Sequence, residues 1–330
     1  MVLQFILFAT GLVILYYGAQ WLVKAASSIA FQLGIRPMVI GLTVVAMGTS
    51  MPEFVLNFSA VLVGEDALAI GNIIGSNIAN IALILGVSAV LLPFVLSAET
   101  LRKEYPLMLA TSLLFYGLAS DGMISRVDGG ILVLGLMALM IFLVIDSRNH
   151  IRQGANGSGQ LVPGQSADAL QDSQLGNGGL STRKNFLYLV GGMIGLTLGA
   201  RLMVGSAVEI ATILSIHPVV VGLTIVAIGT SLPELAASVV CAMKGETDMS
   251  VGNVLGSNML NILFVVGLIA IIRPIAVEPV SIAQHFPVMI AFALVLYPIA
   301  RFRKSISKME GAFLLLAFAA YLGWLIYPYV

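Results

Sequence analysis

The chain is 330 residues long, has a formal net charge of zero, and is 59% hydrophobic with only 10% charged residues. Its mean hydropathy of +1.02 exceeds that of soluble proteins, and apolar runs of about 20 residues recur along it. These features exclude a soluble globular domain and give no reason to expect a nucleic-acid partner. We expect an all-α polytopic membrane protein in a lipid bilayer, because a β-barrel would show short alternating strands.

Ten apolar spans are expected, in chain order, at residues 2–23, 37–63, 68–94, 104–120, 127–146, 185–210, 217–243, 249–272, 281–300 and 309–328. The first has neither a basic leading segment nor a small-residue cleavage site, which predicts a retained helix and not a signal peptide. Between the fifth and sixth spans, residues 147–184 are rich in Gly, Ser, Gln and Asn and show no apolar periodicity. This composition predicts a flexible linker.

Two motifs occur twice. "GTSMPE" at 48–53 returns as "GTSLPE" at 229–234, and "GNIIGSNIANI" at 71–81 returns as "GNVLGSNMLNI" at 252–262. The same offset of 181 positions relates both pairs, without a gap. An ungapped match over this distance indicates an internal duplication.

The duplication divides the chain into a first transmembrane repeat at 1–146 and a second at 185–330. Each holds five expected spans, and an odd number places the two halves in opposite orientations across the bilayer, as inverted repeats. Thirteen of the 16 Lys and Arg then fall on one side, and only Arg126, Arg201 and Arg273 lie elsewhere. The positive-inside rule therefore predicts a multi-pass protein of the cell (inner) membrane, with both termini outside and the linker cytoplasmic.

Each repeated motif ends in a glutamate, Glu53 or Glu234, about midway along an apolar span. A charged side chain at that depth costs about 2.5 kcal/mol or more, and no Lys or Arg lies nearby in sequence. Two carboxylates carry a charge that matches one Ca²⁺ or two Na⁺. Pro52 and Pro233 break their helices and free backbone carbonyls, which add neutral oxygens of the kind that hard cations prefer. The paired breaks predict a cation site in a transporter.

Further oxygen ligands are expected beside the breaks and along one face of the helices that follow them. Residues four apart share a helix face, which places the serines and asparagines of the second motif together. The candidates are Thr49, Ser50, Thr230, Ser231, Ser76, Ser257, Asn80 and Asn261, with the carbonyls freed around Ala46 and Ala227. Asn72 and Asn253 lie one turn earlier on this face. Asn77 and Asn258 lie off it, which favours a role as hydrogen-bonding contacts between helices.

Paired G-T-S-x-P-E and G-N-x-x-G-S-N-x-x-N motifs in two inverted halves resemble the sodium/calcium exchanger family, prokaryotic type, within the calcium/cation antiporter superfamily. The resemblance covers the chain except the linker. It implies four cation sites in a central cluster and first and sixth helices that slide over a rigid core. The glycines compatible with such sliding are Gly11, Gly18, Gly192, Gly195 and Gly199.

The resemblance also implies a ligand set for each ion. Ca²⁺ would bind the Glu53 and Glu234 side chains with the backbone carbonyls of Thr49 and Thr230. Flanking Na⁺ sites would use Thr49, Ser50 and Ser76 on one side and Thr230, Ser231 and Ser257 on the other, with the carbonyls of Ala46 and Ala227. A middle site would involve Asn80 and Asn261.

One position departs from the family pattern. Many members carry an aspartate where this chain has Asn261, so the pocket holds two acidic groups instead of three. The counter-ion therefore stays open between Na⁺ and H⁺, since either relieves the repulsion between facing glutamates. A Ca²⁺/H⁺ antiporter would share the architecture, a cation channel would conduct downhill through carboxylate rings, and an intramembrane hydrolase lacks a His or Lys base in these spans.

Several other polar residues have simpler interpretations. Glu209 and Glu278 are expected near the outer interface, and His217 at the membrane surface. Cys241 is the single cysteine, which excludes an internal disulfide and predicts a small apolar side chain in a helix. No cofactor is expected; Ca²⁺, Na⁺ and H⁺ are candidate transported ions.

Overall fold

The computed structural model describes residues 1–156, 181–214, 216, 221, 224–225, 227–303 and 305–327. In the first half, the helices, π-helical turns (η) and short strands are α1 (Val2–Leu33), α2 (Pro37–Ile40), η1 (Gly41–Val45), α3 (Ala46–Thr49), α4 (Met51–Val63), α5 (Asp66–Ala79), η2 (Asn80–Ile84), α6 (Leu85–Leu91), β1 (Phe94–Val95), α7 (Ala98–Arg102), α8 (Glu104–Ala119), β2 (Met123–Ile124) and α9 (Arg126–Asn156).

The second half repeats much of this order. Its elements are α11 (Thr182–Ile213), α13 (Ala227–Thr230), α14 (Leu232–Met243), α15 (Thr247–Leu260), η4 (Asn261–Val266), α16 (Gly267–Ile272), β3 (Ile275–Ala276), η5 (Ser281–His285), α17 (Phe286–Arg303), β4 (Ser305–Ile306) and α18 (Lys308–Ile326).

Seven helices of the described residues are long and apolar enough to cross a membrane, and each overlaps one of the ten expected spans. An eighth candidate is the pair Pro37–Thr49 and Met51–Val63, which is bent by 46°. The chain is therefore an all-α protein with seven to eight helices of spanning length.

The remaining two expected spans are shorter in the described residues. α8 corresponds to the span at 104–120 and holds 16 residues. α13 and α14 correspond to the end of the span at 217–243; most of its beginning, including His217, lies outside the described residues. The count of ten spans and their division into inverted repeats stay predictions.

The helices that border the linker extend further than expected. α9 continues past residue 146 to Asn156, and α11 begins at Thr182. A helix that already exists adds residues without a new nucleation cost, so a polar stretch can continue it beyond its apolar part. The rest of the expected linker lies outside the described residues.

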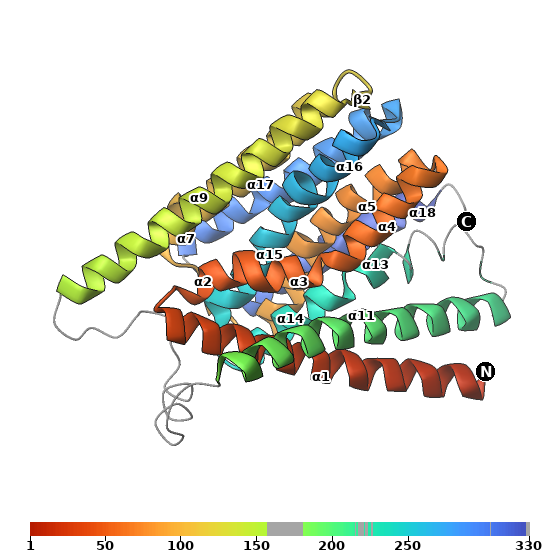
Figure 1. Ribbon diagram of the computed structural model, residues 1–330. Helices are drawn as coiled ribbons and strands as arrows, with labels where there is room; N and C mark the ends of the chain where they lie inside the picture. The colour runs from red at the N-terminus through yellow and green to blue at the C-terminus, as the bar shows by residue number, and fades with distance from the viewer. Residues whose placement is uncertain are drawn as a thin grey trace.

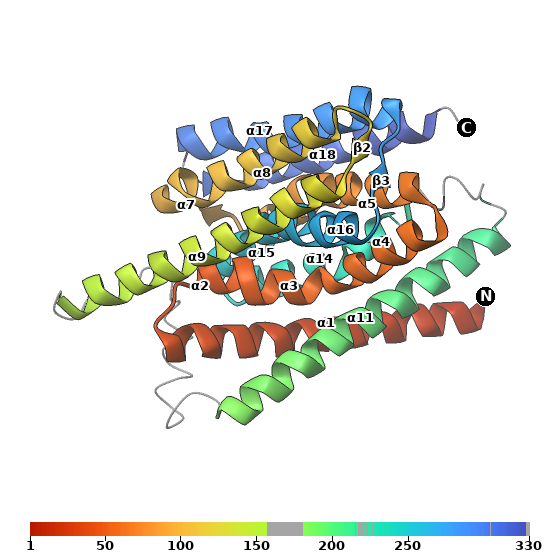
Figure 2. The same ribbon diagram turned by 45° about the horizontal axis from the view of Figure 1, so that its top comes forward.

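The two halves pack into each other. α1 and α11 lie together along one side of the bundle (Figure 1). Figure 2 shows α8, α17 and α18 on the opposite side. Between these layers α15 of the second half packs against α2, η1 and α3 of the first, while α9 packs on α16 and α18 on α6. Two-stranded antiparallel ladders pair β1 with β4 and β2 with β3, and so also join the halves. Any site near the centre is therefore built from both halves.

Glycines allow α1 and α11 to approach closely. A Cβ added to Gly18 would lie 2.6 Å from the backbone nitrogen of Leu196, and one on Gly192 would lie 2.6 Å from that of Leu22. Gly11 and Gly199 approach each other similarly, and Gly195 lies against Gly18. All five glycines that the sequence analysis associated with sliding thus line this one interface. Small residues at such contacts let two helix backbones approach in a membrane.

An ion-pair cluster connects the start of α2 to α7, α8 and α9. The Arg36 guanidinium lies 3.0 Å from Glu99, 2.8 Å from Glu104 and 2.5 Å from Asp146, and the Lys103 ammonium lies 2.6 Å from Glu99 and 2.5 Å from Asp146. Burial opposes the charge of Arg36, but the carboxylates of Glu104, Glu99 and Asp146 outweigh it and raise the pKa of the guanidinium above its ordinary value. The cluster therefore holds the N-terminal end of the bent span, Pro37–Val63, against α7, α8 and α9.

The helix contact predicts opposite effects at two adjacent glycines. Gly192→Ala forces the backbones of α1 and α11 apart and should lower the free energy of unfolding by about 1–3 kcal/mol. Gly191→Ala is the matched control and should raise the free energy of unfolding slightly, because alanine favours helix. Its Cβ would lie no closer than 3.4 Å to the Trp21 ring. Thermal unfolding of the detergent-purified proteins measures both changes. Equal unfolding midpoints for the two variants would contradict the close contact.

Candidate cation site

Both copies of the first motif interrupt a helix at their serine. Ser50, at φ −83° and ψ 2°, separates α3 from α4, and Ser231, at φ −88° and ψ 5°, stands directly before α14. Pro52 and Pro233 lie in the first two positions of the helices that follow, where a missing N–H is tolerated. The helix break predicted at the first motif is confirmed by the 46° bend of its span.

Glu53 and Glu234 lie in the first turns of α4 and α14, and each has a relative exposure of 0%. Their carboxyl groups interact with each other, and within the described part of the chain neither forms a salt bridge. The helix N-termini carry partial positive charge, which offsets only part of two buried negative charges. Two unpaired buried carboxylates therefore require a cation or protons as counter-charge.

Eight buried side-chain oxygens of the predicted ligand set have no hydrogen-bond partner among the described residues. They are Glu53 Oε1 and Oε2, Glu234 Oε2, Ser76 Oγ, Ser231 Oγ, Ser257 Oγ, Asn80 Oδ1 and Asn261 Oδ1. Buried polar atoms in proteins are nearly always paired, so this many unpaired oxygens call for an explanation. A hard cation, which binds through carboxylate, hydroxyl and amide oxygens, fits this donor set.

The hydroxyls beside the first break reach across to the second half. Ser50 Oγ donates to Glu234 Oε1 at 3.0 Å, and Thr49 Oγ1 lies 3.3 Å from both Asn253 Oδ1 and the Ala46 carbonyl. That carbonyl also accepts the Ser50 N–H at 2.9 Å. A cation bound to the Ala46 oxygen would therefore compete with these hydrogen bonds. Ser50 and Thr49 are at most 1% exposed.

A hydrogen-bond chain continues from Thr49 to the second glutamate. Asn253 Nδ2 donates to the Glu234 backbone carbonyl at 3.2 Å and to Ser238 Oγ at 2.9 Å. All four residues are buried and come from both halves. The chain joins the break in one half to the glutamate turn of the other.

A matching chain runs in the opposite direction. Thr230 Oγ1 donates to Asn72 Oδ1 at 3.2 Å, Asn72 Nδ2 donates to Asn57 Oδ1 at 3.2 Å, and Asn57 Nδ2 donates to the Glu53 carbonyl at 2.7 Å. Thr230 and Asn72 are only partly buried. The Glu234 turn is thus held by Asn253, which itself contacts Thr49. The Glu53 turn is held by Asn57, which is connected to Thr230 through Asn72.

Asn80 and Asn261 begin the π-helical turns η2 and η4. A π-turn widens the helix by one residue, changes the direction of side chains and is frequent at functional sites. Both asparagines are at most 1% exposed, as are Ser76 and Ser257 one turn earlier. The predicted ligands from the second motif are therefore buried at corresponding positions in the two halves.

Comparison with known proteins agrees with this geometry. The family model described as sodium/calcium exchanger protein matches residues 3–145 and 184–327, which is most of the chain. This chain belongs to the sodium/calcium exchanger family. It is a multi-pass integral membrane protein of the prokaryotic type.

Named relatives and a solved structure cover nearly the full length. The chain is 37% identical to inner membrane protein YrbG of Escherichia coli, over 98% of this chain and 96% of that one. It is 34% identical to sodium/calcium exchanger MaX1 of Methanosarcina acetivorans, over 98% and 99%. A structure of the sodium-calcium exchanger NCX_Mj superposes with a TM-score of 0.77 at 30% identity, covering 98% of this chain and 99% of that one.

Some of the residues that support the site were not predicted from the sequence. Neither Asn57, which donates to the Glu53 carbonyl, nor Ser238, which accepts from Asn253, was singled out. Asn72 and Asn253 were placed only on a polar face. The signal was present, because Asn57 and Ser238 are polar, four residues after each glutamate and 181 positions apart.

Glu209, Glu278 and Cys241 form none of the site contacts described above. Glu209 and Glu278 are exposed. Cys241 is fully buried in α14, as expected of a small apolar side chain. Among the described residues, no group of three or more His, Cys, Asp or Glu could hold a metal ion. The other unpaired oxygens of the predicted ligand set, besides those of Glu53 and Glu234, are hydroxyl and amide oxygens.

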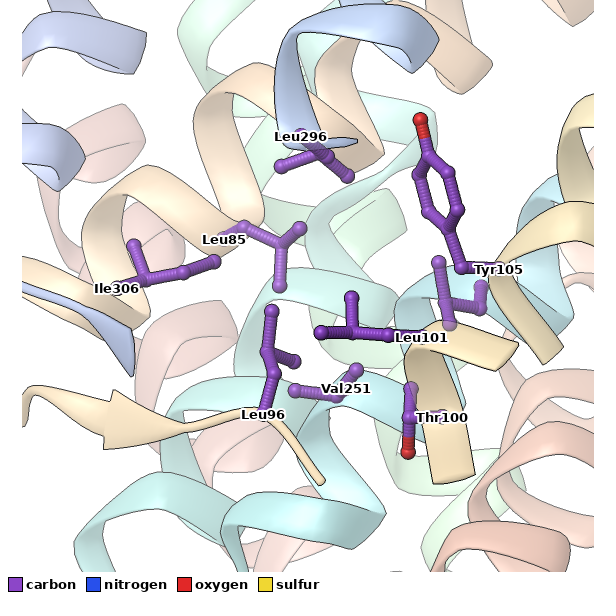
Figure 3. Close-up of a pocket in the computed structure, with 9 residues that line it drawn as sticks. Leu85, Leu96, Thr100, Leu101, Tyr105, Val251, Leu296 and Ile306 are labelled. Carbon is purple, nitrogen blue, oxygen red and sulfur yellow. The ribbon is translucent and has the colours of Figure 1, made fainter. Parts of the chain in front are cut away.

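A separate cavity is unsuited to cations. Its walls are almost entirely apolar (Figure 3), and it is lined by Leu85, Leu96, Thr100, Leu101, Tyr105, Val251, Leu255, Leu296 and Ile306. The Thr100 hydroxyl is hydrogen-bonded to Ser97, and the Tyr105 hydroxyl donates to the Ala293 carbonyl. Two hydroxyls without a carboxylate or amide are too few oxygen ligands for a hard cation.

The two motif serines differ in their partners and predict different mutational effects. Ser50→Ala removes a buried hydrogen bond to the Glu234 carboxylate and should lower the free energy of unfolding by about 1–3 kcal/mol. Ser231→Ala should change it by less than about 0.5 kcal/mol, because Ser231 Oγ has no partner among the described residues and its loss leaves no bond broken. Thermal unfolding in Na⁺- and Ca²⁺-free buffer measures both. The reverse order of destabilisation would contradict this assignment.

Proposed function

We propose that this chain exchanges Ca²⁺ for Na⁺ across the cell membrane by alternating access through one central site. The proposal rests above all on Glu53 and Glu234, two fully buried carboxylates that face each other from opposite halves among unpaired oxygens. Their combined charge matches one Ca²⁺ or two Na⁺. Membership of the exchanger family and the names of MaX1 and NCX_Mj support the same pair of ions.

The proposed ligands follow from the unpaired oxygens and the family resemblance. Glu53 and Glu234 bind Ca²⁺ with the backbone carbonyls of Thr49 and Thr230. Flanking Na⁺ ions bind to oxygens of Thr49, Ser50, Ser76, Thr230, Ser231, Ser257, Ala46 and Ala227, and the amide oxygens of Asn80 and Asn261 face the middle of the cluster. The chain is then a secondary active transporter and not an enzyme, and its ions are transported substrates.

Charge explains how the two fluxes would be coupled. When the pocket holds no cation, two buried negative charges oppose each other and desolvation makes the closed state costly. Either Ca²⁺ or Na⁺ removes that penalty, so only loaded forms change orientation readily. Both ions depend on the negative charge of Glu53 and Glu234 and share oxygens of Thr49 and Thr230, so the pocket does not hold Ca²⁺ and a full load of Na⁺ together. Competition at one site therefore lets the downhill movement of one ion drive the other ion in the opposite direction.

We further propose that the chain consists of ten spans in two inverted repeats, residues 1–146 and 185–330, joined by a cytoplasmic linker with both termini outside. The matched hydrogen-bond chains and the two stretches matched by the family model support this division. The helices α1 and α11, whose glycine contact is related by the same 181-residue offset, are the elements that would slide. The E. coli relative is named an inner membrane protein, which supports the location.

Neutralising either glutamate should abolish exchange. Glu53→Gln and Glu234→Gln each remove half of the counter-charge and should reduce Ca²⁺ uptake at least 100-fold, an effect of about 3 kcal/mol or more. The measurement is ⁴⁵Ca²⁺ uptake by proteoliposomes under an imposed Na⁺ gradient. Glu209→Gln and Glu278→Gln, at exposed glutamates, are matched controls that should retain uptake. Uptake by Glu53→Gln equal to that of the controls would refute the site.

The counter-ion is tested separately, because Asn261 leaves the pocket with two carboxylates. Wild-type proteoliposomes with an outward Na⁺ gradient and equal pH on both sides should accumulate ⁴⁵Ca²⁺. A pH gradient without Na⁺ should give no more uptake than liposomes without protein. If uptake instead follows the pH gradient and ignores Na⁺, the exchanger uses protons. Ca²⁺ flux without any counter-gradient requirement would identify a channel.

A further inference from the structure

Four buried asparagines form two hydrogen bonds between the halves. Asn80 Nδ2 donates to Asn258 Oδ1 at 3.0 Å, and Asn261 Nδ2 donates to Asn77 Oδ1 at 3.3 Å. Each of the four is at most 1% exposed. The two bonds correspond under the 181-residue offset, so the same arrangement occurs twice. In each pair, the proposed ligand, Asn80 or Asn261, donates the hydrogen bond. The acceptor is the asparagine three residues before the proposed ligand of the other half.

Two methionine sulfurs hold the accepting asparagines in place. Asn77 Nδ2 lies 3.8 Å from Met289 Sδ on α17, and Asn258 Nδ2 lies 3.6 Å from Met108 Sδ on α8. The methionines are at most 1% exposed and are also 181 positions apart. A thioether sulfur accepts hydrogen bonds weakly and donates none, so it faces the amide nitrogen and not the amide oxygen. The amide oxygen of each asparagine is thereby turned toward its partner in the other half.

The consequence reaches the proposed ligands. Because the nitrogens of Asn80 and Asn261 donate to Asn258 and Asn77, their oxygens have no partner among the described residues. An amide turned the other way would present N–H groups, which repel a cation. We propose that Asn77 and Asn258, held by Met289 and Met108, are positioning residues that keep the Asn80 and Asn261 oxygens available to the transported cation. The inference rests on the proposed function, because the cation is the one that the exchanger carries.

The same geometry distinguishes asparagine from aspartate at position 261. A carboxylate accepts hydrogen bonds and donates none, so in an Asn261→Asp protein Asn77 would have to offer its nitrogen. That requires its amide to turn, which places the oxygen against Met289 and ends the sulfur contact. Met289 should therefore matter only when residue 261 is asparagine. Met108 acts through Asn258 on Asn80 and should matter in either case.

A double-mutant cycle tests this directly. Met289→Leu and Met108→Leu, which conserve volume, are made in the wild-type chain and in the Asn261→Asp chain. Equilibrium binding of ⁴⁵Ca²⁺ to the purified full-length protein in detergent gives the dissociation constants. In the wild-type chain each substitution should weaken binding by roughly two- to fivefold. In the Asn261→Asp chain Met108→Leu should keep this effect, whereas Met289→Leu should leave the dissociation constant unchanged.

The outcomes separate the two proposals. Equal effects of Met289→Leu in both chains, or no effect of either substitution in the wild-type chain, would overturn the positioning role. Met249→Leu, at a buried methionine elsewhere on α15, should leave binding unchanged in both chains and controls for general loosening. If Met289→Leu does not fold, Met289→Ile removes the same sulfur. Wild-type protein that binds no Ca²⁺ would overturn the proposed function itself.

Discussion

The structure depends on the burial of two like charges. Glu53 and Glu234 are both 0% exposed and face each other without a basic partner among the described residues. Such a pair is unfavourable by itself, because desolvation and mutual repulsion both oppose ionisation. It is tolerated only in a protein that supplies a cation or proton from outside. The feature that costs stability is therefore the feature that we propose binds the transported ion.

The surrounding fold holds these charges in position by reciprocal contacts. Each glutamate turn is anchored by an amide, from Asn57 or from Asn253, and each chain of hydrogen bonds ends at the threonine beside the other half's break. Neither half can form the site alone. The two halves also depend on each other through packing. α15 packs against helices of the first half, and α1 packs against α11 through glycine contacts.

The halves are similar in sequence but not equivalent in their contacts. Ser50 donates to Glu234, whereas the corresponding Ser231 hydroxyl has no partner in the described residues. A Cβ on Gly48 would meet Met193, and one on Gly229 would meet Val204. Both side chains belong to α11, so the two corresponding glycines do not face corresponding helices. A transporter that opens to one side at a time requires such non-equivalence, since a fully symmetric arrangement would treat both sides of the membrane alike.

The sequence alone predicted the features that follow from local chemistry. Apolar run length predicted helices of spanning length, the proline behind each serine predicted the helix break, and the repeated glutamates predicted where charge would be buried. These succeed because they depend on a few neighbouring residues. The continuation of α9 to Asn156 was not foreseen, because helix propagation beyond an apolar run leaves no apolar pattern.

Only the tertiary structure decided which groups meet. No pattern indicated that Asn253 would contact Thr49, that Arg36 would join three carboxylates, or that Met108 would lie beside Asn258. Each pair is more than sixty residues apart in the chain. A side chain's hydrogen-bond partner depends on how distant helices pack and rotate, and many packings share the same local pattern. The chain thus determined by itself which oxygens were available for a cation, and the packing of its two halves determined which of them were left unpaired.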